Sequence, residues 1–303
     1  MIINLFSYRN EKSKFEDLIT FNGVVAWSLR KAFRRQGVKA RLVSDKQLYE
    51  EDIPEADNSI AISSWVMRNI RDDTKIRTKV RNATKNKLVL YLETDYGHWE
   101  KFFDYVFTVI KPTHGQERYL YGGWGADPEY FYPEQDERAI FIDSLMYEYN
   151  YGKAVNDAYD IIKEVFNLPE ENLKTGKSLL HETVIGGEPI TVYMPNPIYK
   201  TPSRIPWTEM QKIMRKCSFH LCTQRGEAGL PRIEAATCGA LLVVPEGLYR
   251  PRSMDSLEHI RWRTKQELIN ALAVKTNPVK IRKRALEHSW DKVVKRMLPY
   301  FRG

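Results

Sequence analysis

The sequence predicts an α/β protein of two domains, each a β/α/β layer built around a parallel sheet. Short apolar runs alternate with longer segments whose apolar residues recur at helical spacing, which is typical of parallel strands joined by crossover helices. Residues 122–137 interrupt this alternation with three glycines and two prolines, and the alternation then starts again. With 303 residues, of which 43% are hydrophobic, the chain is long enough to bury two cores.

The first half reads as a β/α/β unit followed by further strands. Ile2–Phe6 is apolar and precedes a helix-period segment from Val24, and Gly37 suits the C-terminal cap of that helix before a strand at Lys39–Val43. A crossover of this length makes the two strands parallel. Buried parallel strands are continuous apolar runs, so we expect more strands at 59–63, 87–92 and 105–110, with helix or loop over 66–83.

The second half repeats the alternation. We expect strands at 139–142, 190–194, 218–223 and 240–244, helices at 154–166, 207–216 and 231–238, and an amphipathic tail helix over 289–301. The predicted domains are therefore residues 1–133 and 134–288, followed by the C-terminal segment 289–303.

Composition limits the class of protein and its partners. Forty-seven Lys and Arg against 39 Asp and Glu give a formal net charge of +8, which favours a polyanion such as nucleic acid, nucleotide or an anionic membrane surface. Cys217, Cys222 and Cys238 form no C-x-x-C pair, so we expect a reducing compartment without disulfides or structural zinc. The N-terminus lacks a signal-peptide pattern and no apolar run reaches about 18 residues, so we expect a cytoplasmic protein without a transmembrane segment. The oligomeric state stays open.

Several motifs that carry chemistry are missing from the sequence. Gly176-Lys177-Ser178 lacks the first glycine of a P-loop, and Gly123-x-Gly125 lacks the third glycine of the dinucleotide fingerprint. The sequence has no Asp-x-Asp pair, no histidine cluster with metal-ligand spacing and no G-x-S-x-G elbow. We therefore expect no bound metal.

Residues 218–247 form the most informative stretch, reading as strand, glycine-rich turn, short helix and strand. Gly226 and Gly229 let a ligand approach the backbone, and Pro231 suits the first helical turn. The amides and the dipole at that helix start form an anion site, and Glu234 follows one turn later, where a carboxylate accepts hydrogen bonds from hydroxyls. The alternative interpretation is an ordinary β-α-β turn.

This stretch resembles the donor-binding signature of retaining, group 1-like GT-B glycosyltransferases, in which two glutamates surround Gly-Leu-Pro. Gly229-Leu230-Pro231 and Glu234-Ala235 match that signature. The resemblance implies a GT-B fold, with two Rossmann-like domains, an interdomain cleft and a C-terminal helix that crosses back onto the first domain. It also implies metal-independent transfer from a nucleotide diphosphate sugar, expected to be a UDP-sugar, with no other cofactor.

The resemblance also assigns roles to single residues. It implies that Glu234 binds the ribose of the nucleotide. The first glutamate of the signature contacts the donor sugar; Gly226 stands at its position, and Glu227, one residue later, is the candidate for that role. The usual Gly-Arg and Lys that hold the diphosphate are not at their places, so the candidate cations are Lys153 and either Arg225 or Arg232. The expected donor-binding residues are Lys153, Arg225, Gly226, Glu227, Gly229, Leu230, Pro231 and Glu234.

A second candidate site follows the predicted strand 87–92, at a carboxyl end where open α/β sheets bind ligands. We expect Glu93, Asp95 and His98 to be catalytic together with Glu227, and His98 is suited to proton transfer. The alternative is a capped loop in which Asp95 is an N-cap and His98 faces solvent.

Basic clusters in the first half indicate the acceptor side. Residues 28–46 hold seven Lys and Arg, and residues 68–87 hold eight. Such a surface binds polyanions by releasing counterions, although a solvated helix face is the usual alternative. Trp124, in the loop 122–127, is either a stacking surface or a packed hinge aromatic. The expected acceptor contacts are Gly23, Trp65, Arg71, Lys75, Arg77 and Tyr96, with Trp65 and Tyr96 stacking on a displaced base.

The resulting hypothesis is a hexosyl- or pentosyltransferase that moves a sugar onto a hydroxymethylated base in DNA, as phage DNA-modifying glycosyltransferases do. The alternative acceptors are a cell-surface glycan, a lipid-linked sugar or a protein. Two other classes also stay open: a non-catalytic nucleic-acid-binding protein on a degenerate transferase fold, and a nucleotide-sugar epimerase.

Overall fold

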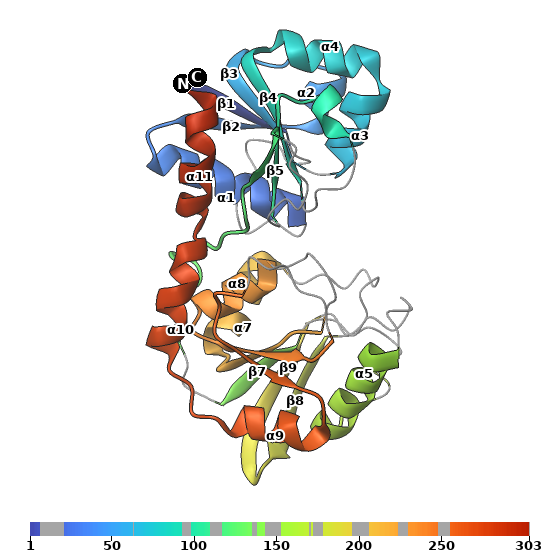
Figure 1. The fold of residues 1–303 in the computed structure, drawn as a ribbon, viewed down its shortest axis with the longest axis vertical. Helices are drawn as coiled ribbons and strands as arrows, with labels where there is room; N and C mark the ends of the chain where they lie inside the picture. The colour runs from blue at the N-terminus through green and yellow to red at the C-terminus, as the bar shows by residue number, and fades with distance from the viewer. Residues whose placement is uncertain are drawn as a thin grey trace. The chain divides into compact units, whose positions relative to one another are not determined.

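The computed structural model describes residues 1–6, 21–62, 64–92, 98–109, 117–134, 138–142, 153–169, 171, 178–195, 206–223, 230–247 and 255–302 (Figure 1). The chain divides into two compact units. The first comprises Met1–Gly125 with His288–Gly303, and the second comprises Ala126–Glu287. Each unit is built around a six-stranded sheet, so the predicted α/β class with two β/α/β layers is confirmed.

The first unit has a parallel sheet in the order β2-β1-β3-β4-β5-β6. Its elements are β1 (Ile2–Phe6), α1 (Phe21–Arg35), β2 (Lys39–Val43), α2 (Asp45–Tyr49), β3 (Ala56–Ile62), α3 (Ser64–Asp72), α4 (Thr74–Asn82), β4 (Thr84–Leu92), η2 (Trp99–Lys101), β5 (Tyr105–Thr108), β6 (Tyr119–Tyr121), α11 (Trp290–Met297) and η5 (Leu298–Phe301). β1 and β2 coincide with the predicted strands. Helix α2 was not predicted from the sequence, although Ser44 and Gln47 form a capping box at its start.

Helices cover both faces of this first sheet. The chain moves one way along the sheet from β1 to β2 and the other way from β3 to β4, so right-handed crossovers place α1 and α3–α4 on opposite faces. Leu48, Ile70 and Val80 of α2–α4 are buried in one cluster with side chains of β1, β3 and β4. α11 packs beside α1, where Arg35 forms a 2.9 Å ion pair with Asp291 (Figure 1).

The second unit has the strand order β12-β11-β10-β7-β9-β8, parallel except for the antiparallel pair β8–β9. Its elements are β7 (Ala139–Ile142), α5 (Lys153–Phe166), β8 (Leu179–Ile185), β9 (Glu188–Met194), α7 (Trp207–Lys216), β10 (Phe219–Leu221), α8 (Leu230–Thr237), β11 (Leu241–Pro245), β12 (His259–Trp262), α9 (Lys265–Ala273), α10 (Pro278–Ala285) and η4 (Leu286–His288). β7 and α7 have the predicted bounds, whereas β8, β12, α9 and α10 were not predicted.

The β8–β9 hairpin is the largest addition to the predicted second sheet. Gly186 and Gly187 connect its strands, and both have positive φ, +64° and +86°. A two-residue turn with two positive φ values matches the twist of antiparallel strands, and glycine adopts it without strain. The Gly-Gly pair between two segments rich in strand-forming residues is therefore a sequence pattern that predicts this hairpin.

The first residues of the second unit, which follow Gly125, are held by hydrogen bonds to the rest of that unit. The Arg282 guanidinium, from α10, donates hydrogen bonds to the carbonyls of Phe131, Pro128 and Thr237, the last two at 3.1 and 2.5 Å. Arg215 at the end of α7 donates to the Tyr130 carbonyl at 2.8 Å. The start of the second unit is thus fixed by two arginines from distant helices.

Each sheet contains one place where the direction of the strand order reverses. In the first sheet, β1 lies between β2 and β3; in the second, β7 lies between β9 and β10. Open α/β sheets bind ligands outside the carboxyl ends of the strands at such a reversal. These ends are followed along the chain by residues 7–20 and 63 in the first unit, and by residues 143–152 and 222–229 in the second.

Candidate functional site

The predicted donor stretch begins where β10 ends, at the reversal point of the second sheet. Cys222 and Thr223 are fully buried, and the Thr223 carbonyl accepts a 2.9 Å hydrogen bond from the hydroxyl of Tyr159, a buried residue of α5. This bond ties α5 to the last described residue before the turn. The turn itself, with the predicted residues Arg225, Gly226, Glu227 and Gly229, lies outside the described residues.

Helix α8 follows this turn and starts at Leu230, one residue before its predicted start. Leu230 and Ile233 are buried, and Pro231 is half-buried in the first turn, where its missing N–H costs no helical hydrogen bond. Gly239, with φ +85°, ends the helix, and a Cβ there would lie 2.6 Å from a Pro278 side-chain atom of α10. The close approach of α8 and α10 therefore requires this glycine.

Glu234 is the most unusual side chain of α8. It is only 1% exposed, and its Oε2 has no hydrogen-bond partner in the described part of the chain. Burial raises the pKa of its carboxyl well above the ordinary value of 4.5. A buried carboxyl group costs free energy unless a hydrogen-bonding group reaches it, so this group is suited to a polar ligand that carries hydroxyls.

One further predicted donor residue, Lys153, belongs to a helix that follows a neighbouring strand of the same sheet. Lys153 is the first residue of α5, which follows β7, and β7 and β10 are neighbouring parallel strands that pair Ile142 with Leu221. The side chain of Lys153 lies outside the described residues. His220, which was not among the predicted site residues, is fully buried in β10, and its ring lies 5.0 Å from that of Phe141 in β7.

In the first unit, the predicted catalytic segment follows β4. Glu93, Asp95 and Tyr96 lie outside the described residues, and His98 is the first described residue after them. The His98 side chain is 77% exposed, and its Nδ1 lies 3.3 Å from Oε1 of Glu100. Glu100 Oε2 accepts a 3.0 Å hydrogen bond from the Tyr119 hydroxyl. Neither Glu100 nor Tyr119 was among the predicted site residues.

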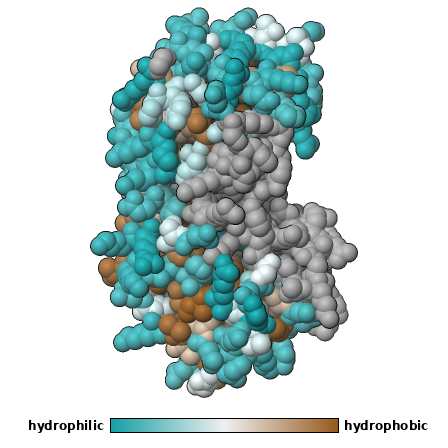
Figure 2. All heavy atoms as spheres, in the orientation of Figure 1, coloured by the Kyte–Doolittle hydropathy of each residue, from teal (hydrophilic) through white to brown (hydrophobic). Residues whose placement is uncertain are grey.

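The predicted acceptor cations of α3 and α4 have different environments. Arg71 pairs with Asp72 at 2.7 Å and lies 5.4 Å from the centre of the Trp99 ring. Arg77 donates to the Arg71 carbonyl at 2.8 Å and to the Thr74 hydroxyl at 3.0 Å, so it joins the two helices. Lys75 is exposed, and no described residue forms an ion pair with it. Figure 2 shows a largely hydrophilic surface over α4.

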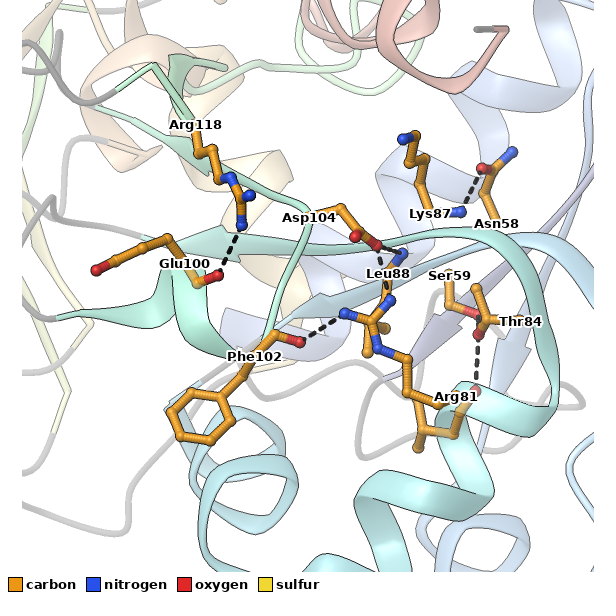
Figure 3. A network of polar contacts seen from close by, with 11 residues as sticks. Asn58, Ser59, Arg81, Thr84, Lys87, Leu88, Glu100, Phe102, Asp104 and Arg118 are labelled. Atoms are coloured by element: carbon orange, nitrogen blue, oxygen red, sulfur yellow. Dashed lines mark hydrogen bonds and ion pairs between the residues drawn. The ribbon is translucent and has the colours of Figure 1, made fainter.

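Two further cations of this cluster are used inside the first unit. Arg81 forms a 2.8 Å ion pair with Asp104, whose carboxylate also accepts from the Leu88 amide at 2.7 Å (Figure 3). Lys79 donates to the carbonyls of Gln47 and Leu48 at 2.8 and 3.1 Å. The charge run 68–87 is therefore partly structural.

The remaining predicted acceptor residues lie in helices or in the core. Gly23 is buried inside the first turn of α1, which starts two residues earlier at Phe21. Trp65 is in the first turn of α3, and its side chain lies outside the described residues. Trp124 is only 2% exposed and packs against Tyr91 and Trp290 of the same unit, so it is a packed aromatic rather than a stacking surface.

The described ranges provide neither a metal site nor a membrane-spanning helix. No group of three or more His, Cys, Asp or Glu side chains there is arranged to hold a metal ion. No helix within those ranges combines the length and the apolar composition needed to cross a bilayer.

Comparison with known proteins identifies the fold. No family model matches the chain, and no curated protein matches it. The lipopolysaccharide outer core galactosyltransferase WaaB in its apo form is 13% identical, with 99% of each chain covered and a TM-score of 0.51. Sucrose-phosphate synthase from Thermosynechococcus elongatus is 10% identical, with 99% of this chain and 98% of that chain covered and a TM-score of 0.56. The catalytic domain of starch synthase IV from Arabidopsis thaliana, bound to ADP and acarbose, is 8% identical over 99% and 98%, with a TM-score of 0.57. These similarities cover nearly the whole of each chain, so the protein has the GT-B fold that the sequence predicted.

Proposed function

We propose that the protein is a glycosyltransferase that moves a sugar from a nucleotide diphosphate sugar to a hydroxyl group. The observation that carries the proposal is the buried carboxyl of Glu234 in the second unit. It lies in α8, just after the turn at the reversal point of the sheet, and one of its oxygens has no partner in the described part of the chain. The ribose hydroxyls of a nucleotide are groups of the required kind.

The diphosphate of the donor would lie at the N-terminal end of α8. Backbone amides at a helix start carry partial positive charge and stabilise phosphate groups. We propose that Arg225 and Lys153 add charge there and that Glu227 contacts the donor sugar, with a UDP-sugar as the donor. In the reaction, the bond between the sugar C1 and the diphosphate oxygen breaks, and the diphosphate keeps the electron pair. Amides and cations stabilise that developing charge without a metal ion, an effect worth several kcal/mol, on the order of 3.

The acceptor hydroxyl forms the new bond to C1 and loses its proton. We propose His98, aided by Glu93 and Asp95, as the group that takes the proton, since imidazole is the side chain best suited to proton transfer near neutral pH. The resemblance to retaining transferases leads us to expect that the anomeric configuration is kept. Proton NMR of the first product formed, before mutarotation, reads this directly.

A hydroxymethylated DNA base is our first candidate acceptor. Its support is the net charge of +8 and the exposed cation Lys75 on α4, with Arg68 exposed on the neighbouring α3. A surface of this kind loses affinity for DNA steeply as salt concentration rises, because binding releases counterions.

A saccharide or lipid-linked saccharide is the second candidate acceptor. The observation that favours it is the internal use of Arg77, Lys79 and Arg81, which leaves fewer cations of α3–α4 available to phosphates. WaaB, a structural neighbour of this chain, is described as a lipopolysaccharide outer core galactosyltransferase. A protein acceptor, the remaining alternative, would need even fewer surface cations than a saccharide acceptor.

One experiment separates these acceptors. Purified protein is incubated with a panel of nucleotide sugars and with hydroxymethylated DNA, plain DNA or oligosaccharide, and the products are read by mass spectrometry. A gain of one sugar mass on hydroxymethylated DNA alone supports the first candidate. Donor consumption with sugar on the oligosaccharide supports the second.

The same experiment tests the two other classes. A non-catalytic nucleic-acid-binding protein gives no thermal shift with any nucleotide sugar, and an epimerase isomerises the donor without transferring it. The variant Glu234→Ala should lose about tenfold in affinity for UDP, since removing one partner of a buried hydrogen bond costs roughly 1–3 kcal/mol. Glu182→Ala, an exposed position on β8 of the same unit, is the matched control and should bind UDP as the wild type does. Equal affinity in both variants contradicts the proposed donor site.

A further inference from the structure

We infer that Glu100 is a positioning residue for His98, holding the imidazole so that its Nε2 can accept the proton of the acceptor hydroxyl. This inference rests on the proposed sugar transfer and adds a residue to its machinery. Glu100 Oε1 lies 3.3 Å from Nδ1 of His98, so we expect the neutral ring to carry its proton on Nδ1, facing this carboxylate. Nε2, the nitrogen on the other side of the ring, is then the basic one, and the side chain is 77% exposed and accessible to a large acceptor.

Glu100 is suited to this role because both of its carboxylate oxygens are engaged. Oε2 accepts a 3.0 Å hydrogen bond from the Tyr119 hydroxyl, while Oε1 faces His98. Burial opposes ionisation of Glu100, but hydrogen bonds from its own backbone, Tyr119 and His98 outweigh it and lower the pKa of the carboxyl. The residue is therefore an anion at neutral pH, available to stabilise an imidazolium beside it.

The backbone of this turn is held by the neighbouring edge strand. The Trp99 amide donates to the Tyr119 hydroxyl at 3.1 Å, so the same hydroxyl bonds both the backbone and the side chain of the turn. Arg118 donates to the Glu100 carbonyl at 3.0 Å (Figure 3). The amides of Phe102 and Phe103 both bond the Trp99 carbonyl, at 2.9 and 3.1 Å. Glu100 thus has a fixed position from which it can orient the exposed ring of His98.

The surroundings of the pair are suited to an anionic or polyhydroxyl acceptor. Trp99, the chain neighbour of His98, is buried under the guanidinium of Arg71, and Phe102 lies 5.5 Å from the guanidinium carbon of Arg77. The same contacts join the turn to α3 and α4, whose outer side carries Lys75. The turn that contains His98 and Glu100 therefore contacts two of the predicted acceptor cations, Arg71 and Arg77.

The proposed step moves one proton and exchanges one bond at the sugar C1. The acceptor O–H proton moves to Nε2 of His98 while the acceptor oxygen bonds to the sugar C1 on the face from which the diphosphate leaves. The C1–diphosphate bond breaks with its electron pair on the diphosphate, so the anomeric configuration is kept. The ring becomes an imidazolium with protons on both nitrogens, and the Nδ1 proton stays hydrogen-bonded to Glu100. Nε2 then releases its proton to solvent. A carboxylate in this position fixes the tautomer and stabilises the positive ring, without itself becoming protonated.

The test combines a spectroscopic and a kinetic measurement on the full-length protein. Nitrogen-15 NMR of histidine-labelled protein, with His98 assigned from His98→Gln, reports the ring tautomer in neutral solution without any acceptor. We expect the Nδ1–H form in the wild type and a shift toward Nε2–H in Glu100→Ala. With whichever acceptor the transfer panel identifies, kcat should fall about tenfold or more in Glu100→Ala, while UDP affinity stays unchanged.

Two further variants separate positioning from folding. Glu100→Gln keeps the volume and one acceptor oxygen, so it should melt as the wild type does and lose less kcat than Glu100→Ala. Glu117→Ala removes an exposed carboxylate from the edge beside β6 and should leave both the tautomer and kcat unchanged. An Nε2–H tautomer in the wild type, or equal kcat in Glu100→Ala and wild type, overturns the inference. A wild-type Nδ1–H tautomer in a protein that transfers no sugar overturns the proposed function instead.

Discussion

Gly125 lies directly against the backbone of Trp290. A Cβ added to Gly125 would come within 2.6 Å of the Trp290 amide nitrogen and 2.8 Å of its Cα. Gly125 is the last residue of the first part of the first unit, and Trp290 is the first residue of α11, which belongs to the same unit. The two segments where the chain leaves and re-enters this unit therefore touch, and only glycine permits the contact.

The first prediction follows from this contact. Gly125→Ala should destabilise the first unit by roughly 1–3 kcal/mol, because both segments must move apart to admit a methyl group. Urea unfolding followed by tryptophan fluorescence measures the change, since Trp124 and Trp290 are buried beside the site. Gly187→Asn, in the β8–β9 turn, is the control: it keeps a residue that tolerates positive φ and meets no atom within 4 Å. Equal midpoints in both variants would show that the contact is loose.

Arg282 gives the second prediction. Its guanidinium donates hydrogen bonds to the carbonyls of Pro128, Phe131 and Thr237. Arg282→Ala therefore leaves three acceptors without this donor. We expect a loss of roughly 2–3 kcal/mol in the stability of the second unit. Lys283→Ala, the exposed neighbour on α10, should change it by less than about 0.5 kcal/mol. Chemical unfolding of both variants decides this, and equal losses would contradict a specific role for Arg282.

Several buried strands could be predicted from the sequence because their residue composition is typical of a strand that packs in the core. β1 is mostly apolar and β2 alternates charged with apolar residues; both lie beside a helix-period segment, and both have the predicted bounds. β8 was missed because it is an edge strand that carries His181 and Glu182 in its middle, so it lacks that pattern. α9 was missed although Thr264 and Glu267 form a capping box at its start, a signal that is visible in the sequence.

The candidate sites could be predicted only in part, for a physical reason. Glu234 follows a local pattern of glycines, proline and helix within one segment, and such patterns are readable along the chain. Glu100 meets Tyr119 only because β5 and β6 pair in parallel and bring residues 19 positions apart together. Likewise, the charge run 68–87 gave no sign that Arg81 pairs with Asp104. Contacts between elements depend on the register of the sheet, which the local pattern does not specify.

Tyr159 gives the third prediction. Its hydroxyl bonds the Thr223 carbonyl at 2.9 Å and so anchors the chain just before the predicted diphosphate turn. Tyr159→Phe removes this bond and should cost about 1 kcal/mol of stability. We also expect UDP affinity to fall severalfold, because the start of the turn loses its anchor to α5. Isothermal titration calorimetry measures the affinity, with Tyr49→Phe, a residue exposed by 43% in the first unit, as control. Unchanged UDP affinity would limit Tyr159 to a role in folding.

The last prediction concerns pH and the buried carboxyl of Glu234. Burial raises its pKa in the folded protein above the ordinary 4.5 of the unfolded chain. Between these two values the folded state holds a proton that the unfolded state has released, so stability should fall as pH rises through this window. Glu234→Gln cannot ionise and keeps the same shape. We therefore expect the melting temperature of the variant to equal that of the wild type near pH 4 and to exceed it increasingly at higher pH.

The same variant should bind UDP more weakly, since an amide accepts ribose hydroxyls less strongly than a carboxylate. Melting curves from pH 4 to pH 8, with and without UDP, test both halves, and Glu182→Gln on β8 serves as the exposed control. A wild type that remains as stable as Glu234→Gln at pH 8 would show that the carboxyl ionises freely and is not held in a desolvated site.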